Sequence, residues 1–563
     1  MITLALVTIV PIGYGFYLSL TSYNPVERGG PRFHGFDGYL AVLTSGQFWQ
    51  AIWVTVQYAF GTLVLAVPAA LALALLVNGR FPGVALFRAV LYLPRVVPLV
   101  AVSMIWLWLY SHDGLFNYLL DLVGLPPVNY LTDENTALPS LIVMRAWKAL
   151  GGSMIIFLAG LQGIPNSLLE AASVDGCGRW RTLRHVILPL LVPITTYVVV
   201  VDLIYLAQSF SEIYILTSGG PLSSTTVVNM LIYNEAFEHY RLGNASAMAF
   251  LLFCLIFGLA YLSIRTMTKG AGGERATEDR RERPATDARR RGHHDPGGDA
   301  VHLDGVAGRQ TEDRGVRLPA EAPAGAADAG QLLLRLELHE HPRGDDEQPD
   351  RGGAHGRGEL RRRHGGRLCL ARIDFRGSRL LFTAVLGSAM VPAVVQLIPL
   401  FLIVKGFPLA GGNDLFGQGG SGLLDSYAGL VLPMLVQPLN IYLARQYFLD
   451  MSPELADAGR LDGAGELRIF WQIYLPLARP IVATIAILSF TGAWEDFLWP
   501  LVAVSSPQMQ TLPLALSSFA GSGVIQYGPL MAGTIIAIVP VIVIFIVGQR
   551  HFVQGLGSGG VKG

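Results

Sequence analysis

The chain carries few charged residues for its length. Of its 563 residues only 15% are Asp, Glu, Lys or Arg, whereas 52% are hydrophobic, and the mean hydropathy is +0.45. Soluble domains carry about 25% charged residues, so this composition places much of the chain in lipid. The formal net charge is zero, which gives no electrostatic reason to expect nucleic acid as a partner.

Cysteine is scarce, and the common catalytic patterns are missing. Cys177, Cys254 and Cys369 lie far apart and fit neither a disulfide framework nor a metal site. The pattern Gly, four residues, Gly-Lys-Ser/Thr does not occur, so the chain lacks that device for binding ATP. No nucleophile–base arrangement stands out either. We therefore predict a protein that is not an enzyme and that holds no cofactor and no metal.

Long apolar runs are what the sequence has instead. A helix needs about 20 apolar residues to cross a bilayer. Six such runs fall in residues 1–269, at 2–20, 53–77, 87–110, 138–161, 188–209 and 245–264. Four more fall in residues 373–563, at 380–404, 427–444, 478–498 and 530–547. Residues 2–20 lack the basic leader and cleavage site of a signal peptide, so we expect them to form the first span. The predicted fold class is an all-α polytopic membrane protein.

A polar stretch between the apolar runs occurs twice. Residues 170–189 read EAASVDGCGRWRTLRHVILP, and residues 457–476 read DAGRLDGAGELRIFWQIYLP, at an offset of 287 residues. The residues that define the two copies are Glu170, Ala171, Ala172, Asp175, Gly176, Leu188, Pro189, Asp457, Ala458, Asp462, Gly463, Leu475 and Pro476. The spacing predicts a helix, an Asp-Gly turn and a second helix, because glycine tolerates the positive φ that such a turn often needs. An ordinary loop between spans is the alternative for one copy, but two matched copies favour paired docking elements and two related halves.

Loop charges predict on which side of the membrane this stretch lies. The loops after the second, fourth and sixth runs carry Arg80, Arg88, Arg179, Arg181, Arg184, Arg265 and Lys269. The loop after the third run carries Asp113, Asp121, Asp133 and Glu134 instead. Because positively charged loops stay in the cytoplasm, we expect both ends of the first half and the stretch 170–189 to be cytoplasmic.

The repeated stretch resembles the signature of a known family. The pattern EAA, three residues, Gly, nine residues, an aliphatic residue, one residue and Leu-Pro is similar to that of permease subunits of binding-protein-dependent ABC importers. The strings LTSYN at 20–24, LTSGGP at 216–221 and WEDFLWP at 494–500 resemble the carbohydrate-uptake branch, which includes maltose, trehalose and glycerol-phosphate permeases. The chain thus looks like two partner permeases joined in one.

The resemblance implies partners and a location. Both loops would couple to a dimer of cytoplasmic ABC ATPases, and an extracellular or periplasmic sugar-binding protein would deliver the sugar. The chain would lie in the bacterial plasma (inner) membrane, in contact with lipid, and would form the translocation path. The second copy departs from the pattern, because Gly459 replaces the second alanine at a cost of about 1 kcal/mol in a helix. We expect weaker docking through this half.

Polar residues inside the apolar runs are functional candidates. Asp202, Tyr205 and Gln208 recur at intervals of three in the fifth run, on one helical face. Trp494 and Glu495 lie near the matching end of the second half. Polar side chains and aromatic rings suit hydroxyl-rich sugars, so these five residues are candidates for the substrate path. Inter-helix packing and hydrogen bonding remain the open alternative.

The middle of the chain has an unusual composition. Residues 270–372 contain no Phe, Tyr, Trp, Ile, Met, Asn, Ser or Lys, although disordered linkers are usually rich in Ser and Lys. One interpretation is an Arg/Gly/Ala-rich linker between fused permeases. Another is a GC-rich coding region translated in the wrong frame, since the residues that the alternative frame permits resemble the opening of the partner permease. We hypothesise a frame change near 270–288 and its reversal near 370–372, so the seven histidines between His293 and His364 are not a metal tract.

Two other functions compete with the importer. An ion-coupled secondary transporter with an internal repeat would show broken helices and ion ligands at the membrane midplane, but it would not need two matching cytoplasmic loops. A membrane scaffold or channel is the third hypothesis. Transport that requires a separate ATPase and an external binding protein distinguishes the importer from both. The sequence does not name the sugar.

Overall fold

The chain is mostly helical in the part that the computed structural model describes, which comprises residues 9–27, 30–79, 81–259, 261, 382, 385, 387–388, 391–435, 437–521 and 526–557. Within these residues the only sheet is an antiparallel pair of two-residue strands, β1 (Thr21–Ser22) and β2 (Arg32–Phe33). The predicted all-α class is therefore confirmed. The segment 270–372 lies outside the described residues.

The first half is built on three long apolar helices, α4 (Gly46–Val77), α8 (Glu134–Gln162) and the helix Leu242–Leu259. Apart from those of the repeated stretch, its other described helices are α2 (Val10–Ser19), α3 (Asp37–Thr44), α5 (Val84–Val96), α6 (Leu99–Leu109), α7 (Leu115–Leu122), α12 (Val192–Ala207), α13 (Ser211–Leu216) and α14 (Val228–Tyr233). Small residues of α4, including Ala70 and Ala74, pack against Met154 and Phe157 of α8. Small side chains let two membrane helices approach closely, so this pair forms the frame of the half.

The described residues of the second half form a similar set of helices. Apart from those of the repeated stretch, they are α18 (Ala393–Lys405), α19 (Tyr427–Val431), α20 (Pro438–Asp450), α24 (Arg479–Glu495), α25 (Leu498–Ala503), α26 (Leu512–Gly521) and α27 (Tyr527–Gly557). Among the described residues, four helices of the whole chain are long and apolar enough to cross a membrane, or eight if each bent pair counts as one span. The predicted total of ten spans stays a prediction.

The predicted third span is not one straight helix. α5 and α6 meet at 96° where Val97 and Pro98 adopt extended backbone angles. Proline has no N–H and forces the preceding residue out of the helical region, so the helix breaks there. The apolar run predicted over 87–110 is thus present as a bent pair of helices, and its role as one span stays a prediction. In the second half, Pro392 likewise stands directly before α18 with extended backbone angles.

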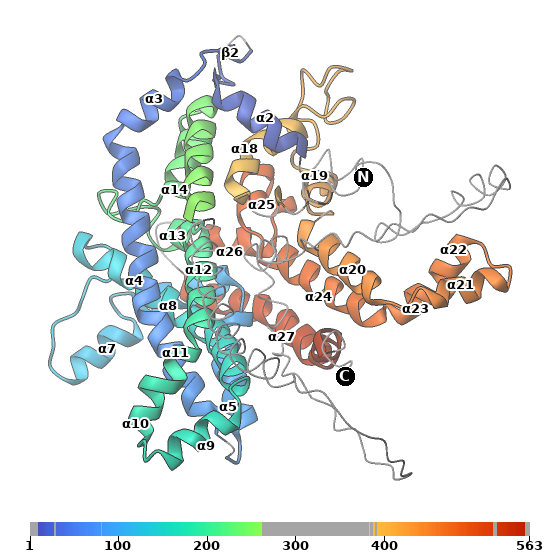
Figure 1. The fold of residues 1–563 in the computed structure, drawn as a ribbon. Coiled ribbons are helices and arrows are strands. Elements are labelled where there is room, and N and C mark those ends of the chain that lie inside the picture. Colours follow the sequence, from blue (N-terminus) through green and yellow to red (C-terminus); the bar gives the residue numbers. More distant parts are fainter. Residues whose placement is uncertain are drawn as a thin grey trace, which may run out of the picture.

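The two halves pack against each other reciprocally. Met104 of α6, in the first half, shares a buried core with Leu514 and Leu530 of the second half. In return, Val395 of α18 is buried with Met248 of the first half. Figure 1 shows the blue-to-green half and the yellow-to-red half meeting along this line. Such an exchange of equivalent elements is what a pseudo-twofold axis between the halves requires.

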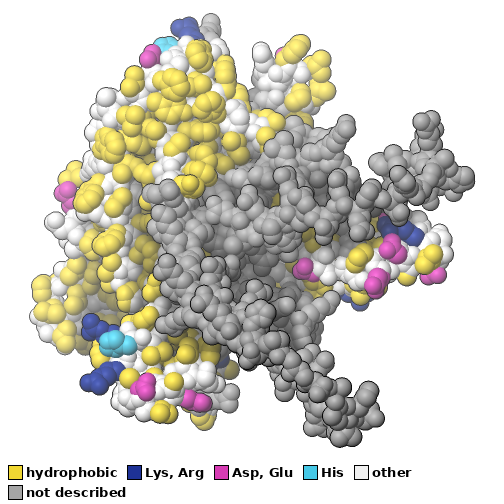
Figure 2. Space-filling model, in the orientation of Figure 1, with side chains coloured by type: hydrophobic (Ala, Val, Ile, Leu, Met, Phe, Trp, Pro, Cys, Tyr) yellow, Lys and Arg dark blue, Asp and Glu magenta, His cyan; other side chains and the backbone are white. Residues whose placement is uncertain are grey.

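Charged side chains gather away from the apolar body. Figure 2 shows a broad hydrophobic surface over the first half, with basic and acidic groups concentrated at the top near β2 and on two projections. These projections lie at the bottom and at the right of the view. Figure 1 places α9 (Asn166–Val174) and α10 (Arg179–Thr182) at the bottom, and α21 (Glu454–Leu461) and α22 (Glu466–Ile469) at the right. A wide uncharged belt of this kind suits a lipid environment.

Candidate functional site

The first copy of the repeated stretch forms a helical hairpin. α9 (Asn166–Val174) ends at Asp175, and α10 (Arg179–Thr182) begins after Gly178. Gly176 takes a φ of +72°, and the Cys177 N–H donates to the Ala172 carbonyl at 2.9 Å. This bond and the left-handed glycine form a Schellman-type end to α9. Beyond α10, the π-helical segment Leu183–Ile187 and α11 (Leu188–Leu190) lead into α12.

The second copy has the same backbone, element for element. α21 (Glu454–Leu461) and α22 (Glu466–Ile469) flank Gly463, which has a φ of +77°. The Ala464 N–H donates to the Gly459 carbonyl at 3.0 Å. The π-helical segment Phe470–Tyr474 and α23 (Leu475–Leu477) follow, each 287 residues after its counterpart. Both copies thus have the predicted helix, turn and helix, while their role stays a prediction.

The defining residues divide between the tip and the base of each hairpin. Glu170, Ala171, Asp175 and Gly176 are exposed along α9 and its turn, and Ala172 is buried. Asp457, Ala458, Asp462 and Gly463 are likewise exposed along α21 and its turn. Leu188, Pro189, Leu475 and Pro476 lie at the base, where α11 and α23 begin. The tips are therefore free to meet a partner, and the bases start the next span.

The two hairpins differ in how they hold their first carboxylate. Asp457 pairs with Arg460 at 2.7 Å, and Arg460 also contacts Glu466 at 2.7 Å. The hydrogen bond with Glu466 raises the pKa of Arg460, so this guanidinium stays charged near neutrality. Ser173 occupies the position of Arg460 in the first copy. The second hairpin therefore carries an ion-pair network of its own.

Gly459 makes room for larger neighbours. A Cβ at this position would lie 3.0 Å from Cδ1 of Ile473 and 3.1 Å from Cγ1 of Ile469. The matching residues around Ala172 are the smaller Val186 and Thr182. The glycine that weakens α21 locally thus lets two isoleucines pack against it, a compensation that the sequence pattern alone does not show.

Inside the body, Asp202 joins two helices of the first half. Ser153 Oγ of α8 donates to Asp202 Oδ2 of α12 at 2.9 Å. In the second half, Asn440 Nδ2 of α20 donates to Ser489 Oγ of α24 at 2.8 Å. Each of these four residues lies 287 positions from its counterpart. The recurrence supports a packing role for position 202, and the carboxylate is the feature particular to the first half.

The other predicted path residues fall into two groups. Tyr205 is 45% exposed, and the Arg95 guanidinium lies 5.9 Å from its ring centroid. Glu495 interacts electrostatically with Lys148 and Arg95, and Asp202 with Arg145 and Arg95. By contrast, Gln208 Nε2 donates to the Ile204 carbonyl, and Trp494 Nε1 donates to the Ala537 carbonyl. The structure therefore gathers Asp202, Tyr205 and Glu495 around shared cations and leaves Gln208 and Trp494 bonded to nearby backbone.

Sequence reasoning missed the cations themselves. Arg145 and Lys148 lie inside the apolar run 138–161, a position that marks an ionisable residue as functional. Lys148 Nζ donates to the Val97 carbonyl at 2.6 Å and to the Pro94 carbonyl at 3.3 Å, so it caps the broken end of α5.

A buried acid lies next to Arg145. Arg145 Nε is 3.6 Å from Glu212 Oε1, which also accepts a hydrogen bond from the Tyr58 hydroxyl at 2.8 Å. Glu212 is 1% exposed. A buried carboxylate is tolerated only when paired, and here a guanidinium and a phenol provide the partners.

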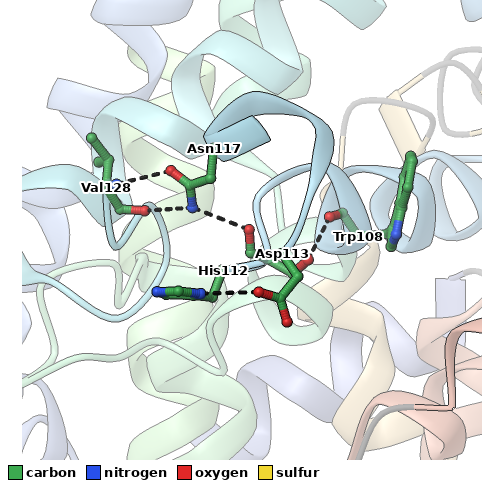
Figure 3. Close-up of polar contacts among 6 residues, drawn as sticks. Trp108, His112, Asp113, Asn117 and Val128 are labelled. Atoms are coloured by element: carbon green, nitrogen blue, oxygen red, sulfur yellow. Dashed lines mark hydrogen bonds and ion pairs between the residues drawn. The ribbon is translucent and has the colours of Figure 1, made fainter. Parts of the chain in front are cut away.

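A buried asparagine anchors the loop that follows α6. Asn117 accepts a hydrogen bond from the Val128 N–H at 2.8 Å and donates to the carbonyls of Val128 and Ser111 at 3.2 Å (Figure 3). After α18, Asn413 does the same, because it accepts from the Gly420 N–H and donates to the Lys405 and Phe407 carbonyls. Both halves thus hold the loop that follows α6 or α18 with one amide side chain.

Comparison with known proteins gives the same division into halves. The family model described as "Binding-protein-dependent transport system inner membrane component" matches residues 63–267 and again residues 366–558. The chain is 34% identical over 264 residues to the "Probable ABC transporter permease protein YesP" of Bacillus subtilis, a stretch that is 46% of this chain and 84% of that protein.

Two further relatives carry names that state a cargo. The chain is 39% identical over 194 residues to the "Arabinooligosaccharides transport system permease protein AraQ" of Bacillus subtilis, covering 34% of this chain and 64% of that protein. It is 33% identical over 274 residues to the "Trehalose/maltose transport system permease protein MalF" of Thermococcus litoralis, covering 47% of this chain and 90% of that protein.

Proposed function

The chain belongs to the family of binding-protein-dependent transport system inner membrane components, and we propose that within this family it is the permease of an ATP-driven sugar importer. The family model matches twice, so the chain is a multi-pass transport component of the bacterial inner membrane with two related halves. What supports a sugar as cargo is the pair of relatives named for arabinooligosaccharides and for trehalose and maltose. Disaccharides and sugar-like molecules such as glycerol phosphate form the proposed cargo class.

The two hairpins are the proposed sites of coupling to a cytoplasmic ABC ATPase dimer. Their support is the matched backbone of the two copies and the exposure of their tips, including Glu170 and Asp457. Two equivalent projections suit the two subunits of a dimer, because symmetric partners present the same surface twice. The basic residues near the first hairpin support its cytoplasmic orientation. ATP-driven closure of the dimer would move the hairpins and, with them, the spans.

The proposed substrate path comprises Asp202, Tyr205, Gln208, Trp494 and Glu495. The strongest support falls on Asp202, Tyr205 and Glu495, which all interact with Arg95; Glu495 also interacts with Lys148. Charged groups inside a membrane protein are costly unless they line a polar path or belong to a paired cluster. An external sugar-binding protein would deliver the sugar to this path.

Reconstitution tests the proposal. The chain would be inserted into liposomes with its ATPase and its sugar-binding protein, and uptake of labelled maltose and arabinooligosaccharide would be followed. We expect uptake only when all three components and ATP are present. Uptake that continues without the ATPase and collapses when an ionophore removes the ion gradient would replace the importer by the ion-coupled alternative.

A further inference from the structure

Two phenylalanines at equivalent positions contact each other across the halves. Phe210 and Phe497 are separated by 287 residues, the same offset that relates the hairpins. Their ring centroids lie 6.5 Å apart, and their planes are inclined by 30°. In an assembly of two rotated halves, only residues beside the axis touch their own equivalents. This stack therefore marks the pseudo-twofold axis.

Each ring comes from an interruption in a helix. Phe210 lies between the end of α12 and the start of α13, and Phe497 lies between α24 and α25. Because the backbone leaves the helix at these points, each side chain extends toward the other half. Gln208 and Glu495, two residues earlier in each half, belong to the proposed path. The polar wall of the path thus leads directly to the stacked rings.

The stack is buried in a largely apolar core. Phe210 is 4% exposed and Phe497 is 1% exposed. The Tyr214 ring lies 5.4 Å from Phe210 and 5.6 Å from Phe497, and the Tyr233 ring lies 5.2 Å from Phe210. The surrounding core draws on both halves and includes Leu206, Met230, Leu514, Leu516 and Leu530. Such a layer offers a hydrated sugar no replacement for most of the hydrogen bonds it would lose.

We propose that the Phe210–Phe497 stack is the closed gate of the translocation path. When the halves move apart, the rings separate and present two flat apolar faces against which the C–H face of a sugar packs. This inference rests on the proposed function, because a gate requires a path. Because the stack lies on the axis, each half contributes one of its two rings. A movement of either hairpin therefore acts on the same ring contact.

Cross-linking tests the position and the movement. In a chain whose cysteines 177, 254 and 369 are replaced by serine, Phe210→Cys and Phe497→Cys would be joined by a reversible bis-methanethiosulfonate reagent. We expect the halves to stay linked after cleavage at a protease site engineered between them. We also expect the initial rate of ATP-driven uptake, measured before sugar drains through the cysteine pair that lacks the rings, to fall at least tenfold on linkage and to recover on reduction.

The matched control is Val174→Cys with Leu461→Cys. These positions also lie 287 residues apart, are 87% and 89% exposed, and occupy hairpins that Figure 1 places far from each other. The same reagent should not link them. Linkage of the control pair, or no linkage between positions 210 and 497, would refute the axial placement.

A leak assay tests the seal. Liposomes loaded with labelled maltose and carrying Phe210→Ala/Phe497→Ala should release the sugar without ATP at least ten times faster than the parent, whereas Phe210→Leu/Phe497→Leu should remain sealed. If the alanine pair stays sealed and imports sugar normally, the gate proposal is refuted and the proposed importer function is unaffected. If the parent imports no sugar but the cross-link forms and the alanine pair leaks, the proposed ATP-driven import is refuted. The stack is then supported as the seal of a passive path.

Discussion

Asp202 and Ser489 occupy the same position in the two halves, and each accepts a hydrogen bond from the side chain 49 residues before it. The donor is Ser153 in one half and Asn440 in the other. The inter-helix bond is therefore common to both halves, and the negative charge belongs to the first alone. Inter-helix packing accounts for the hydrogen bond that both halves share. We therefore assign to the substrate path only the negative charge of Asp202.

This separation predicts the behaviour of Asp202→Asn. The amide keeps an acceptor for Ser153, so the loss of stability should stay near 1 kcal/mol, the difference between a hydrogen bond to a charged group and a neutral one. Sugar uptake should fall several-fold, because the carboxylate no longer interacts with Arg95 and Arg145. The control is Ser489→Ala, which removes the equivalent bond and should spare uptake. Unchanged affinity and rate in Asp202→Asn would remove this residue from the path.

Lys148 should be essential to the broken span. Lys148→Met leaves the Val97 and Pro94 carbonyls without their ammonium donor at the end of α5, and each buried unsatisfied acceptor costs about 1–3 kcal/mol. We expect a clearly lower melting temperature of the detergent-solubilised chain. Lys405→Met, at the exposed end of α18, should melt like the parent. Equal melting of the two variants would show that the break does not depend on Lys148.

The close packing of Ile473 against Gly459 predicts that substitutions at these two positions are energetically coupled. Gly459→Ala gains about 1 kcal/mol of helix propensity but crowds Ile473, so alone it should change stability little. Adding Ile473→Val recreates the Ala172–Val186 pair of the first hairpin. Because the smaller valine removes the crowding, the double variant should show the full stability gain expected from helix propensity. A double-mutant cycle of unfolding free energies measures the coupling. Purely additive effects would contradict the proposed compensation.

Asp425 predicts a pH-dependent loop contact. Its carboxylate accepts hydrogen bonds from the Ser506 N–H at 3.0 Å, the Ser506 hydroxyl at 2.9 Å and the Ser505 N–H at 3.1 Å, and these bonds lower its pKa. A depressed pKa means that the stabilisation is complete above the ordinary value of about 4 and is lost as the pH falls through the folded value. Amide hydrogen exchange of Ser505 and Ser506, corrected for intrinsic rates, should therefore accelerate on acidification below that range. Asp425→Asn should abolish this pH dependence, and a parent whose exchange protection does not change with pH would contradict the assignment.

The hairpins were predictable because their determinants are local. A helix-forming segment, an Asp-Gly turn and a Leu-Pro restart lie within 20 consecutive residues, and glycine alone adopts the turn angle without strain. The break between α5 and α6 was missed although Pro98 was visible, because the apolar run continues through it. The surroundings of Arg145 depend on Tyr58 and Glu212, which lie far away in sequence. The Phe210–Phe497 contact needed the fold, since the repeat gives equivalence but not proximity.

The final prediction concerns the gene. The second family match begins at residue 366, close to the predicted reversal of the reading frame at 370–372, and AraQ is covered over only 64% of its length. If residues 270–372 come from a shifted frame, the nucleotide sequence read in the alternative frame will encode two further apolar spans. Peptide mass spectrometry of the native membrane should then find those spans and no Arg-rich peptides from this segment. The control regions are 1–269 and 373–563, where the alternative frame should encode nothing that resembles a permease. Arg-rich peptides recovered from the membrane protein would establish the segment as a true linker, because a misread frame leaves no such product.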